Sequence, residues 1–336
     1  MKIGSFDTDR RVLVVAEIGN NHEGNYQLAA EMVRQAARTG VGAVKFQTMR
    51  AAHFVRRADS ARFERLKRFE LSREQFASLS ELAHELGLLF ISTPFYLEAA
   101  GFLEPLVDAY KIASGDNDFF PLLDRVAHTG KPVIVSTGVS DLAQIAAAVG
   151  SLRAQWHAQS RTGELGLLHC VSSYPTPPEQ ANLRSIPFLA ARFDCTIGYS
   201  DHTLGTEAAV LAVAAGARII EKHFTLDKHY SDFRDHQLSA DPAEMEMLVK
   251  RIGEAELLLG TWGKSIQPCE AASQTAIRRS IMAAHDLKGG TTLQAADLKW
   301  IRPGDGLRPG NEGQLIGKRL KRDLQEDDAI SPGDVE

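Results

Sequence analysis

Two histidines and two lysines in this chain each stand at or near the end of a short apolar run. His202 closes the segment IGYSDH and His223 closes IIEKH, while Lys45 and Lys111 lie in AVKFQT and AYKIASG. Two imidazoles brought together can share one divalent cation and leave coordination positions open for substrate oxygens and water. A buried lysine is costly unless it is paired with an anion. These residue types therefore predict a metal site beside an anion site.

Hydroxyl side chains occur at equivalent positions of the other apolar runs. They are Thr93, Ser114, Ser136, Ser172 and Ser200. Together with the two lysines they predict a cradle for a small, highly charged anion, such as a phosphate that also carries a carboxylate. Two alternatives stay open: a lysine paired with a carboxylate for structure only, and a Schiff-base lysine at Lys111.

These side chains need a fold that brings strand ends together. Eight strand-like runs follow one another, and each pair is separated by a stretch long enough for one helix. The expected helices cover residues 26–38, 74–86, 97–107, 119–129, 141–158, 180–191, 203–215 and 242–259. Eight βα units are the pattern of an α/β fold, the (β/α)8 TIM barrel, whose active site lies at the C-terminal strand ends. The fold therefore places His202 and His223 on neighbouring strands, with the lysines and hydroxyls around the same mouth.

The pattern changes after residue 260. We expect a catalytic barrel domain over 1–260, a linker over 261–275 without periodicity, and a small β-rich domain over 276–336. A faint repeat in the last part predicts two related halves. Its matching positions are Asp286-Leu287, Leu293 and Asp297-Leu298 against Asp323-Leu324, Ile330 and Asp334-Val335. Chance similarity is the alternative, because the match is short.

Composition excludes several classes of protein. A formal net charge of -5 provides no basic stripe for nucleic acid, and the longest apolar runs have only the length of strands, so no membrane span is expected. Three cysteines without metal-site spacing favour a reducing cytoplasm.

The whole chain resembles the sialic acid synthase (N-acetylneuraminate synthase) family, which condenses phosphoenolpyruvate with an N-acyl hexosamine. The barrel segments that carry the resemblance are AEIGNNHEGN, AVKFQT, FISTPF, YKIASGD, PVIVSTG, LLHCVSSYPTPPEQANL, IGYSDHTLG and EKHFTLD. RRSIMAAHDLKGGTTL and IRPGDG resemble the family's antifreeze-protein-like SAF domain. The resemblance implies a TIM barrel followed by a small SAF domain.

The resemblance also assigns roles to residues. It implies a divalent cation on His202 and His223, usually Mn2+, with Mg2+ or Co2+ as alternatives. It implies phosphoenolpyruvate binding by Lys45, Thr93, Lys111, Ser114, Ser136, Ser172 and Ser200. The implied sugar site comprises Glu17, Gln47, Tyr174 and Asp235, together with Arg302, which a domain-swapped homodimer would bring to the acetamido group. Lys45 and Lys111 would be catalytic, and Glu17 or Asp235 would manage protons.

The chain departs from the family pattern near the expected sugar pocket. Asp116 replaces a frequent glutamate, FTLDKHYSDFRDHQLS replaces a Gly-Pro-Asp-His turn, and the segment 53–69 is rich in arginine. N-acetylmannosamine is the default acceptor; a diacetamido-trideoxyhexose, leading to legionaminic or pseudaminic acid, comes second, and mannose third. More distant alternatives are a Schiff-base aldolase and a non-enzymatic carbohydrate-binding or ice-binding protein.

Overall fold

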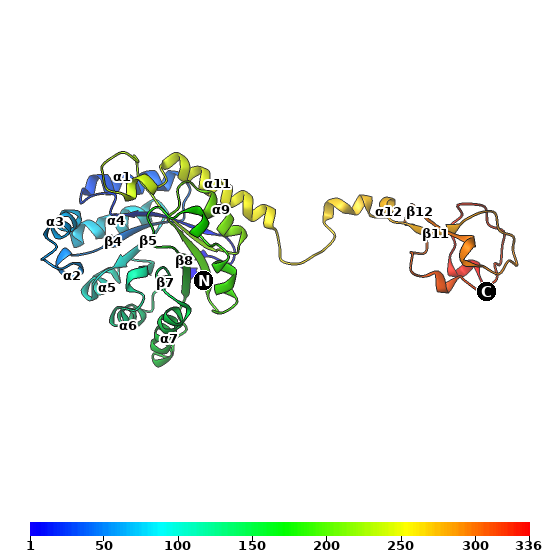
Figure 1. Ribbon diagram of the computed structural model, residues 1–336, viewed down its shortest axis with the longest axis horizontal. Helices are drawn as coiled ribbons and strands as arrows, with labels where there is room; N and C mark the ends of the chain where they lie inside the picture. Colours follow the sequence, from blue (N-terminus) through cyan, green and yellow to red (C-terminus); the bar gives the residue numbers. More distant parts are fainter. The chain divides into compact units, whose positions relative to one another are not determined.

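The computed structural model describes all 336 residues, Met1 to Glu336. The chain forms two compact units, Met1–Gly260 and Thr261–Glu336. In Figure 1 the first unit runs from blue to yellow and the second from yellow to red. No helix of either unit combines the length and the apolar character needed to cross a membrane.

The first unit is a closed barrel of parallel strands, which confirms the predicted fold (Figure 1). Each strand pairs with the next along the chain, and the last strand pairs with the first, which closes the barrel. In this last pairing His223 lies opposite Glu17. The strands are β3 (Leu13–Gly19), β4 (Ala43–Thr48), β5 (Leu89–Pro94), β6 (Ala109–Ile112), β7 (Val133–Ser136), β8 (Leu165–Cys170), β9 (Thr196–Asp201) and β10 (Ile219–His223).

Eight helices follow the strands close to the predicted positions. They are α1 (Tyr26–Arg38), α4 (Arg73–Glu85), α5 (Leu97–Leu103), α6 (Phe120–Thr129), α7 (Leu142–Ala158), α8 (Ser185–Ala190), α9 (Glu207–Ala214) and α11 (Pro242–Leu259). Three predicted helices were too long, for local reasons. Pro105 follows α5 and has no backbone N–H to donate, so the helical hydrogen bonds cannot continue through it. Asn182 has φ 44° before α8, and Gly205 has φ 74° before α9, so neither can lie within a helix.

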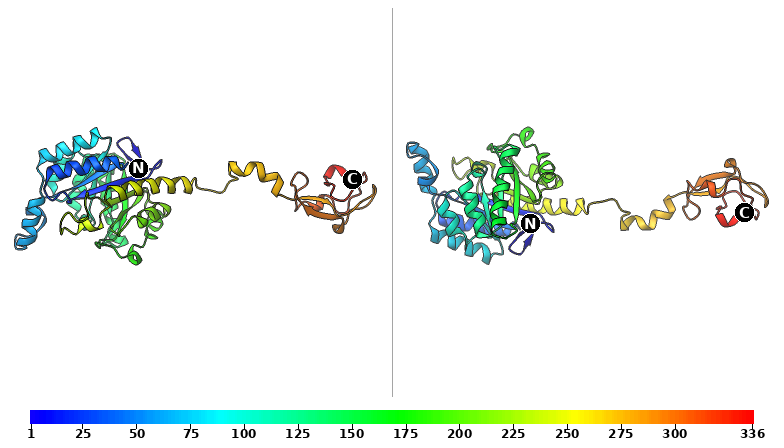
Figure 2. Two further views of the ribbon diagram at one scale, coloured as in Figure 1. Left: turned by 90° about the horizontal axis from the view of Figure 1, so that it is seen from above. Right: turned by 90° about the horizontal axis from the view of Figure 1, so that it is seen from below.

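Two strands and three helices of the barrel unit were not predicted. A hairpin of β1 (Lys2–Ile3) and β2 (Phe6–Asp7) precedes the barrel, and α2 (Ala51–Phe54), α3 (Ser60–Phe69) and α10 (Asp235–Leu238) lie in the loops after strands β4 and β10. In both views of Figure 2, α3 (light blue) projects at the edge of the barrel unit.

Alternation along the strands divides the barrel interior into layers. The lower layer is an apolar plug, because Met1 and Ile3 of the hairpin pack against inward residues of the strands. Those strand residues are Leu13, Val15, Ala43, Ile91, Ala109, Ile134, Leu168 and Ile219. Two residues later on each strand the side chains are almost all polar, and all of them are buried. Those residues are Glu17, Lys45, Thr93, Lys111, Ser136, Cys170, Ser200 and Glu221.

The second unit is small and built around one apolar core. Strands β11 (Ser280–Ala283) and β12 (Leu298–Ile301) pair antiparallel, and Leu287 bridges Leu324. The apolar positions of the predicted repeat share this core: Leu287, Leu293, Leu298, Leu324, Ile330 and Val335. The stretch expected as a linker ends in two helical pieces, η3 (Pro268–Ser273) and α12 (Gln274–Ile277). Short helical turns η4 (Ala295–Asp297), η5 (Glu312–Gln314) and η6 (Pro332–Asp334) complete the unit.

Candidate active site

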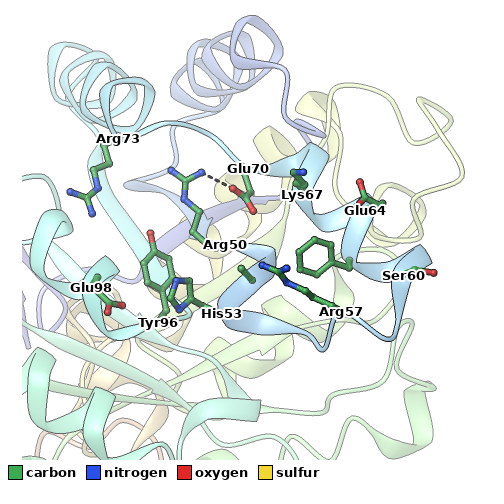
Figure 3. A pocket seen from close by; sticks show the side chains of 12 residues that line it. Arg50, His53, Arg57, Ser60, Glu64, Lys67, Glu70, Arg73, Tyr96 and Glu98 are labelled. Atoms are coloured by element: carbon green, nitrogen blue, oxygen red, sulfur yellow. Dashed lines mark hydrogen bonds and ion pairs between the residues drawn. The ribbon is translucent and has the colours of Figure 1, made fainter.

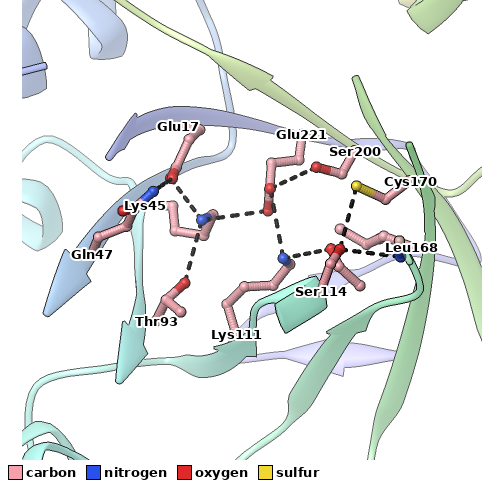
Figure 4. A network of polar contacts seen from close by, with 12 residues as sticks. Glu17, Lys45, Gln47, Thr93, Lys111, Ser114, Leu168, Cys170, Ser200 and Glu221 are labelled. Atoms are coloured by element: carbon pink, nitrogen blue, oxygen red, sulfur yellow. Dashed lines mark hydrogen bonds and ion pairs between the residues drawn. The ribbon is translucent and has the colours of Figure 1, made fainter. Parts of the chain in front are cut away.

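The buried polar layer of the barrel forms one connected network (Figure 4). The Nζ atom of Lys45 lies 2.8 Å from an oxygen of Glu17 and 3.4 Å from the hydroxyl of Thr93. Gln47 donates to Glu17 at 2.9 Å and accepts from Asn20 at 2.8 Å. The structure thus brings together Glu17, Gln47, Lys45 and Thr93, which the sequence assigned to two neighbouring subsites.

Glu221 is the central residue that the sequence analysis missed. Its carboxylate lies 3.8 Å from Nζ of Lys45 and 3.7 Å from Nζ of Lys111, and it accepts a hydrogen bond of 2.9 Å from Ser200. Both lysines are therefore paired with carboxylates of the barrel. Strand alternation was the available signal, because Glu221 stands two residues before His223 on the same strand.

Burial and charge separate the ionisation of these groups. Burial opposes ionisation of Glu221, but Lys111 and Lys45 outweigh it and lower the pKa of Glu221 to about 2. Burial raises the pKa of Glu17 despite the nearby ammonium of Lys45. Burial also acts against the charge of Lys45, but Glu17 and Glu221 prevail and raise its pKa. Burial lowers the pKa of Lys111 in spite of Glu221. The ammonium of Lys111 is thus the less compensated of the two cations, and an added anion would stabilise it most.

Three serines converge beside Lys111. Lys111 donates to Ser136 at 2.6 Å, and the backbone N–H of Gly138 donates to Ser114 at 3.1 Å. A Cβ atom on Gly138 would lie 2.6 Å from the hydroxyl oxygen of Ser114 and 2.4 Å from that of Ser172. The glycine therefore lets two hydroxyls approach one backbone N–H, a donor set that suits a phosphate group.

The two histidines lie side by side, as their strand positions predicted. Their ring centroids are 5.5 Å apart, and the ring of Tyr174 lies 4.1 Å from that of His202. Nδ1 of His202 lies 2.8 Å from the carbonyl oxygen of Val171, so Nδ1 acts as the donor and Nε2 is left free. Nδ1 of His223 is buried without a hydrogen-bond partner and lies 4.0 Å from a carboxylate oxygen of Asp235.

This pair fits a divalent cation held by two protein ligands. Burial lowers the pKa of His223 to about 3, so its imidazole is neutral, the form that binds metals. A backbone carbonyl that fixes the tautomer, as Val171 does for His202, is typical of metal-binding histidines. The chain groups no three His, Cys, Asp or Glu side chains as a metal cluster. Substrate oxygens and water would therefore have to complete the coordination.

A cavity of about 890 Å³ opens above these groups. Its lining includes Gln47, Tyr174 and Asp235, three of the five residues expected at the sugar site, together with His223, which was expected at the metal site. Glu17 lies buried beneath it, bonded to Gln47. Arg302 is an exposed residue of the second unit, just after β12.

Asp235 owes its place to a network that the sequence did not reveal. It begins α10, whose next residue, His236, is fully buried. The ring nitrogens of His236 lie 2.7 Å from the hydroxyl of Thr225 and 3.2 Å from a carboxylate oxygen of Glu23. These contacts hold the short helix, and with it the carboxylate of Asp235, against the barrel mouth.

Comparison with known proteins identifies the family. The sequence profile of the NeuB family matches residues 32–264, and that of the SAF domain matches residues 278–336. The chain belongs to the NeuB family. Two thirds of it thus carry the NeuB pattern, including the strands with Lys45, Lys111, His202 and His223.

Named relatives cover nearly the whole length of this NeuB chain. The N,N'-diacetyllegionaminic acid synthase of Legionella pneumophila is 39% identical across 93% of this chain and 91% of its own length. The N-acetylneuraminate-9-phosphate synthase of Mus musculus is 33% identical across 96% of this chain and 92% of its own. The crystal structure of N-acetylneuraminic acid synthetase from Leptospira borgpetersenii, in complex with citrate, superimposes with a TM-score of 0.76. That structure is 33% identical and covers 81% of this chain and 94% of its own.

Proposed function

We propose that this NeuB-family protein condenses phosphoenolpyruvate with the open-chain form of an N-acyl hexosamine and water, giving a nonulosonic (sialic) acid and phosphate. The observation that carries the proposal is the pair Lys45 and Lys111, buried with serine hydroxyls directly beneath a cavity that contains His223 and Tyr174. An anion site below a polar cavity suits a reaction between a small phosphorylated acid and a sugar. The relatives, which are named as sialic-type synthases, support the same reaction class.

Phosphoenolpyruvate would occupy the floor of the site. Its phosphate would accept hydrogen bonds from Ser114, Ser172 and the N–H of Gly138, where the hydroxyls already converge. Lys111 and Lys45 would bind the remaining oxygens, aided by the hydroxyls of Thr93, Ser136 and Ser200. Preorganised donors of this kind stabilise charge that moves toward the leaving phosphate.

His202 and His223 would hold a divalent cation above that floor, with Mn2+ proposed and Mg2+ or Co2+ as alternatives. A bound cation of this kind polarises a carbonyl oxygen as a Lewis acid. Tyr174, packed at 4.1 Å against the ring of His202, would restrict where the sugar chain can lie. Asp235, which lies 4.0 Å from His223, would accept hydrogen bonds from sugar hydroxyls.

Carbon–carbon bond formation would come first. C3 of phosphoenolpyruvate would attack the aldehyde carbon, and water would add to the cation that develops at C2. The tetrahedral intermediate would then release phosphate by cleavage of its C–O bond. Glu17, whose pKa is raised by burial and which lies 2.8 Å from Nζ of Lys45, would accept one proton from the water and pass it to the former aldehyde oxygen, and the second proton of the water would leave with phosphate.

The decisive experiment is phosphate release from phosphoenolpyruvate, with and without candidate acceptors. N-acetylmannosamine is the default, and a diacetamido-trideoxyhexose, giving legionaminic or pseudaminic acid, is the alternative favoured by the Legionella pneumophila relative. With 18O at the bridging oxygen of phosphoenolpyruvate, C–O cleavage leaves the label in phosphate. Label in the keto-acid product would contradict this mechanism. Trapping of Lys111 by borohydride would instead indicate the Schiff-base aldolase.

We further propose that the protein acts as a domain-swapped homodimer in the cytoplasm. The family resemblance implies that Arg302 would reach the partner's sugar site, where its guanidinium would donate to the acceptor's amide oxygen. The three cysteines are free, which suits a reducing compartment. Subunits carrying Arg302→Ala, mixed with subunits carrying Lys111→Ala, should regain activity, since one site of each heterodimer escapes both changes. Confirmed heterodimers without activity would exclude the swap.

A further inference from the structure

Helix α3 is the part of the barrel mouth that the proposed reaction leaves unexplained. It arises from the arginine-rich stretch SARFERLKRF. Leu66 packs in an apolar cluster with Met49 and Ala51, and the ring of Phe69 meets that of Phe233 edge-on at 5.3 Å. A Cβ on Gly24, whose φ is 83°, would lie only 1.9 Å from the carbonyl oxygen of Arg68. The helix is thus anchored at the rim rather than loosely attached.

The two faces of α3 line different cavities. Arg62, Arg65 and Arg68 line the 890 Å³ cavity that also contains Tyr174, His223 and Asp235. Glu64 and Lys67 line a second cavity of about 800 Å³ on the other side (Figure 3). Helical periodicity produces this division, since residues three apart share a face. The only acidic residue of the helix therefore lies away from the acceptor cavity.

The arginines that face the acceptor cavity are not neutralised there. None of the three is within ion-pair distance of a carboxylate, and most acids of the same cavity are already engaged. Asp235 lies 3.4 Å from the guanidinium of Arg234, and Glu23 contacts Ser231 and His236. Asp232 is the remaining acid of the lining. The rim of the sugar cavity is therefore rich in cations that have no internal partner.

We propose that the acceptor sugar carries an anionic group at the end remote from its aldehyde, and that Arg62 and Arg65 bind it. The inference rests on the proposed function, because that reaction fixes the direction of the sugar. Its aldehyde carbon must meet phosphoenolpyruvate beside His202 and His223, so its C6 end extends toward the rim. Guanidinium groups match phosphate and carboxylate oxygens in paired hydrogen bonds, and both anions satisfy this chemistry.

Three acceptors that differ only at C6 test the proposal. They are N-acetylmannosamine, N-acetylmannosamine 6-phosphate and N-acetylmannosaminuronate. At C6 these sugars carry a hydroxyl, a phosphate and a carboxylate, respectively. We expect the wild-type protein to prefer at least one charged acceptor over the neutral one by about tenfold or more in kcat/KM, measured as phosphate release. In the double variant Arg62→Gln/Arg65→Gln this ratio should fall toward one. The phosphate and carboxylate arms then distinguish the two sources of charge.

Lys67→Gln is the matched control, because it removes a positive charge from the same helix on the opposite face. It should keep the wild-type preference ratio. A wild-type protein that uses the neutral acceptor as well as both charged ones would overturn the proposal. So would an equal loss for all three acceptors in the double variant, which would indicate that the arginines only attract phosphoenolpyruvate.

Failure of the reaction itself would be seen separately. If none of the three acceptors releases phosphate, the proposed function fails for these hexosamines, and calorimetry with the same acceptors then decides the inference. Binding of a charged acceptor that is tighter than that of N-acetylmannosamine, and that weakens about tenfold in the double variant, would still support it. Equal binding of all three would refute it.

Discussion

Replacing Glu221 by glutamine should lower the stability of the protein without substrate and tighten its binding of phosphoenolpyruvate. The carboxylate lies 3.7 Å from Nζ of Lys111 and 3.8 Å from Nζ of Lys45, both buried. Glutamine keeps the shape and the hydrogen bond from Ser200 but removes the charge. Lys111 then has no anion, while Lys45 retains Glu17.

The magnitude follows from these distances. Two unit charges about 4 Å apart interact by about 4 kcal/mol at an effective dielectric constant of about 20. Removal of one member of a buried ion pair costs about 3–5 kcal/mol, which lowers the unfolding temperature of a domain of this size by roughly 10 °C. A bound anion would replace the missing charge. Since about 1.4 kcal/mol corresponds to a tenfold change, recovery of even part of the loss tightens the Kd for phosphoenolpyruvate by about tenfold or more.

Thermal unfolding and calorimetry, both without acceptor, measure the two effects. The matched control is Asp201→Asn, which breaks the equally buried pair with Lys222, 2.9 Å long, on the outer face of the neighbouring strand. Both variants should unfold at a lower temperature than wild type. Added phosphoenolpyruvate should raise the unfolding temperature of Glu221→Gln by more than it raises that of wild type, whereas Asp201→Asn should show only the wild-type increase. Unchanged or weaker phosphoenolpyruvate binding by Glu221→Gln would refute the idea that the carboxylate holds the lysines in place of substrate.

Three other changes have defined outcomes. His223→Ala should abolish stoichiometric binding of Mn2+, measured by elemental analysis after gel filtration; a variant that retains its metal would contradict the two-histidine site. Gly138→Ala pushes away the hydroxyls of Ser114 and Ser172, so the KM for phosphoenolpyruvate should rise by about tenfold while the circular dichroism stays unchanged; an unaltered KM would remove this subsite. Burial, with help from a neighbouring carboxylate, raises the pKa of Asp116 to about 6, so its destabilising effect on the folded protein is absent below about pH 4, grows between about pH 4 and pH 6, and is complete above pH 6. Asp116→Asn should therefore become more stable relative to wild type between pH 4 and pH 7 in thermal unfolding, and a constant difference would exclude this cause.

The barrel was predictable because each strand carries two signals in the sequence. Its apolar run is bounded by turn residues, and its last inward position is polar, as at Lys45 or Lys111. Parallel strands share their C-terminal edge, so the grouping of these side chains followed from topology alone. The same rule placed His202 beside His223.

The partners within the layer were harder to predict. Glu221 was overlooked beside His223, although alternation places both on one face. Helix α3 was missed because its apolar residues, Phe63, Leu66 and Phe69, recur only every third position among charges. Its N-cap, Asp59, accepts from the N–H of Arg62 and was the available local signal. What decides its location is the contact between Gly24 and the backbone of Arg68, and no pattern in one sequence reveals a contact across 44 residues.

Because of the apolar plug beneath the polar layer, the interior of this barrel is accessible from one end only. Met1 and Ile3 fill the end opposite the mouth, so every reactant must pass the cavity that Tyr174 and α3 surround. A substrate that belongs on the floor has to enter before the one that lies above it, and the larger product has to leave before phosphate can. For the proposed reaction we therefore predict an ordered kinetic sequence: phosphoenolpyruvate binds first and the sugar second, and the sugar acid leaves before phosphate.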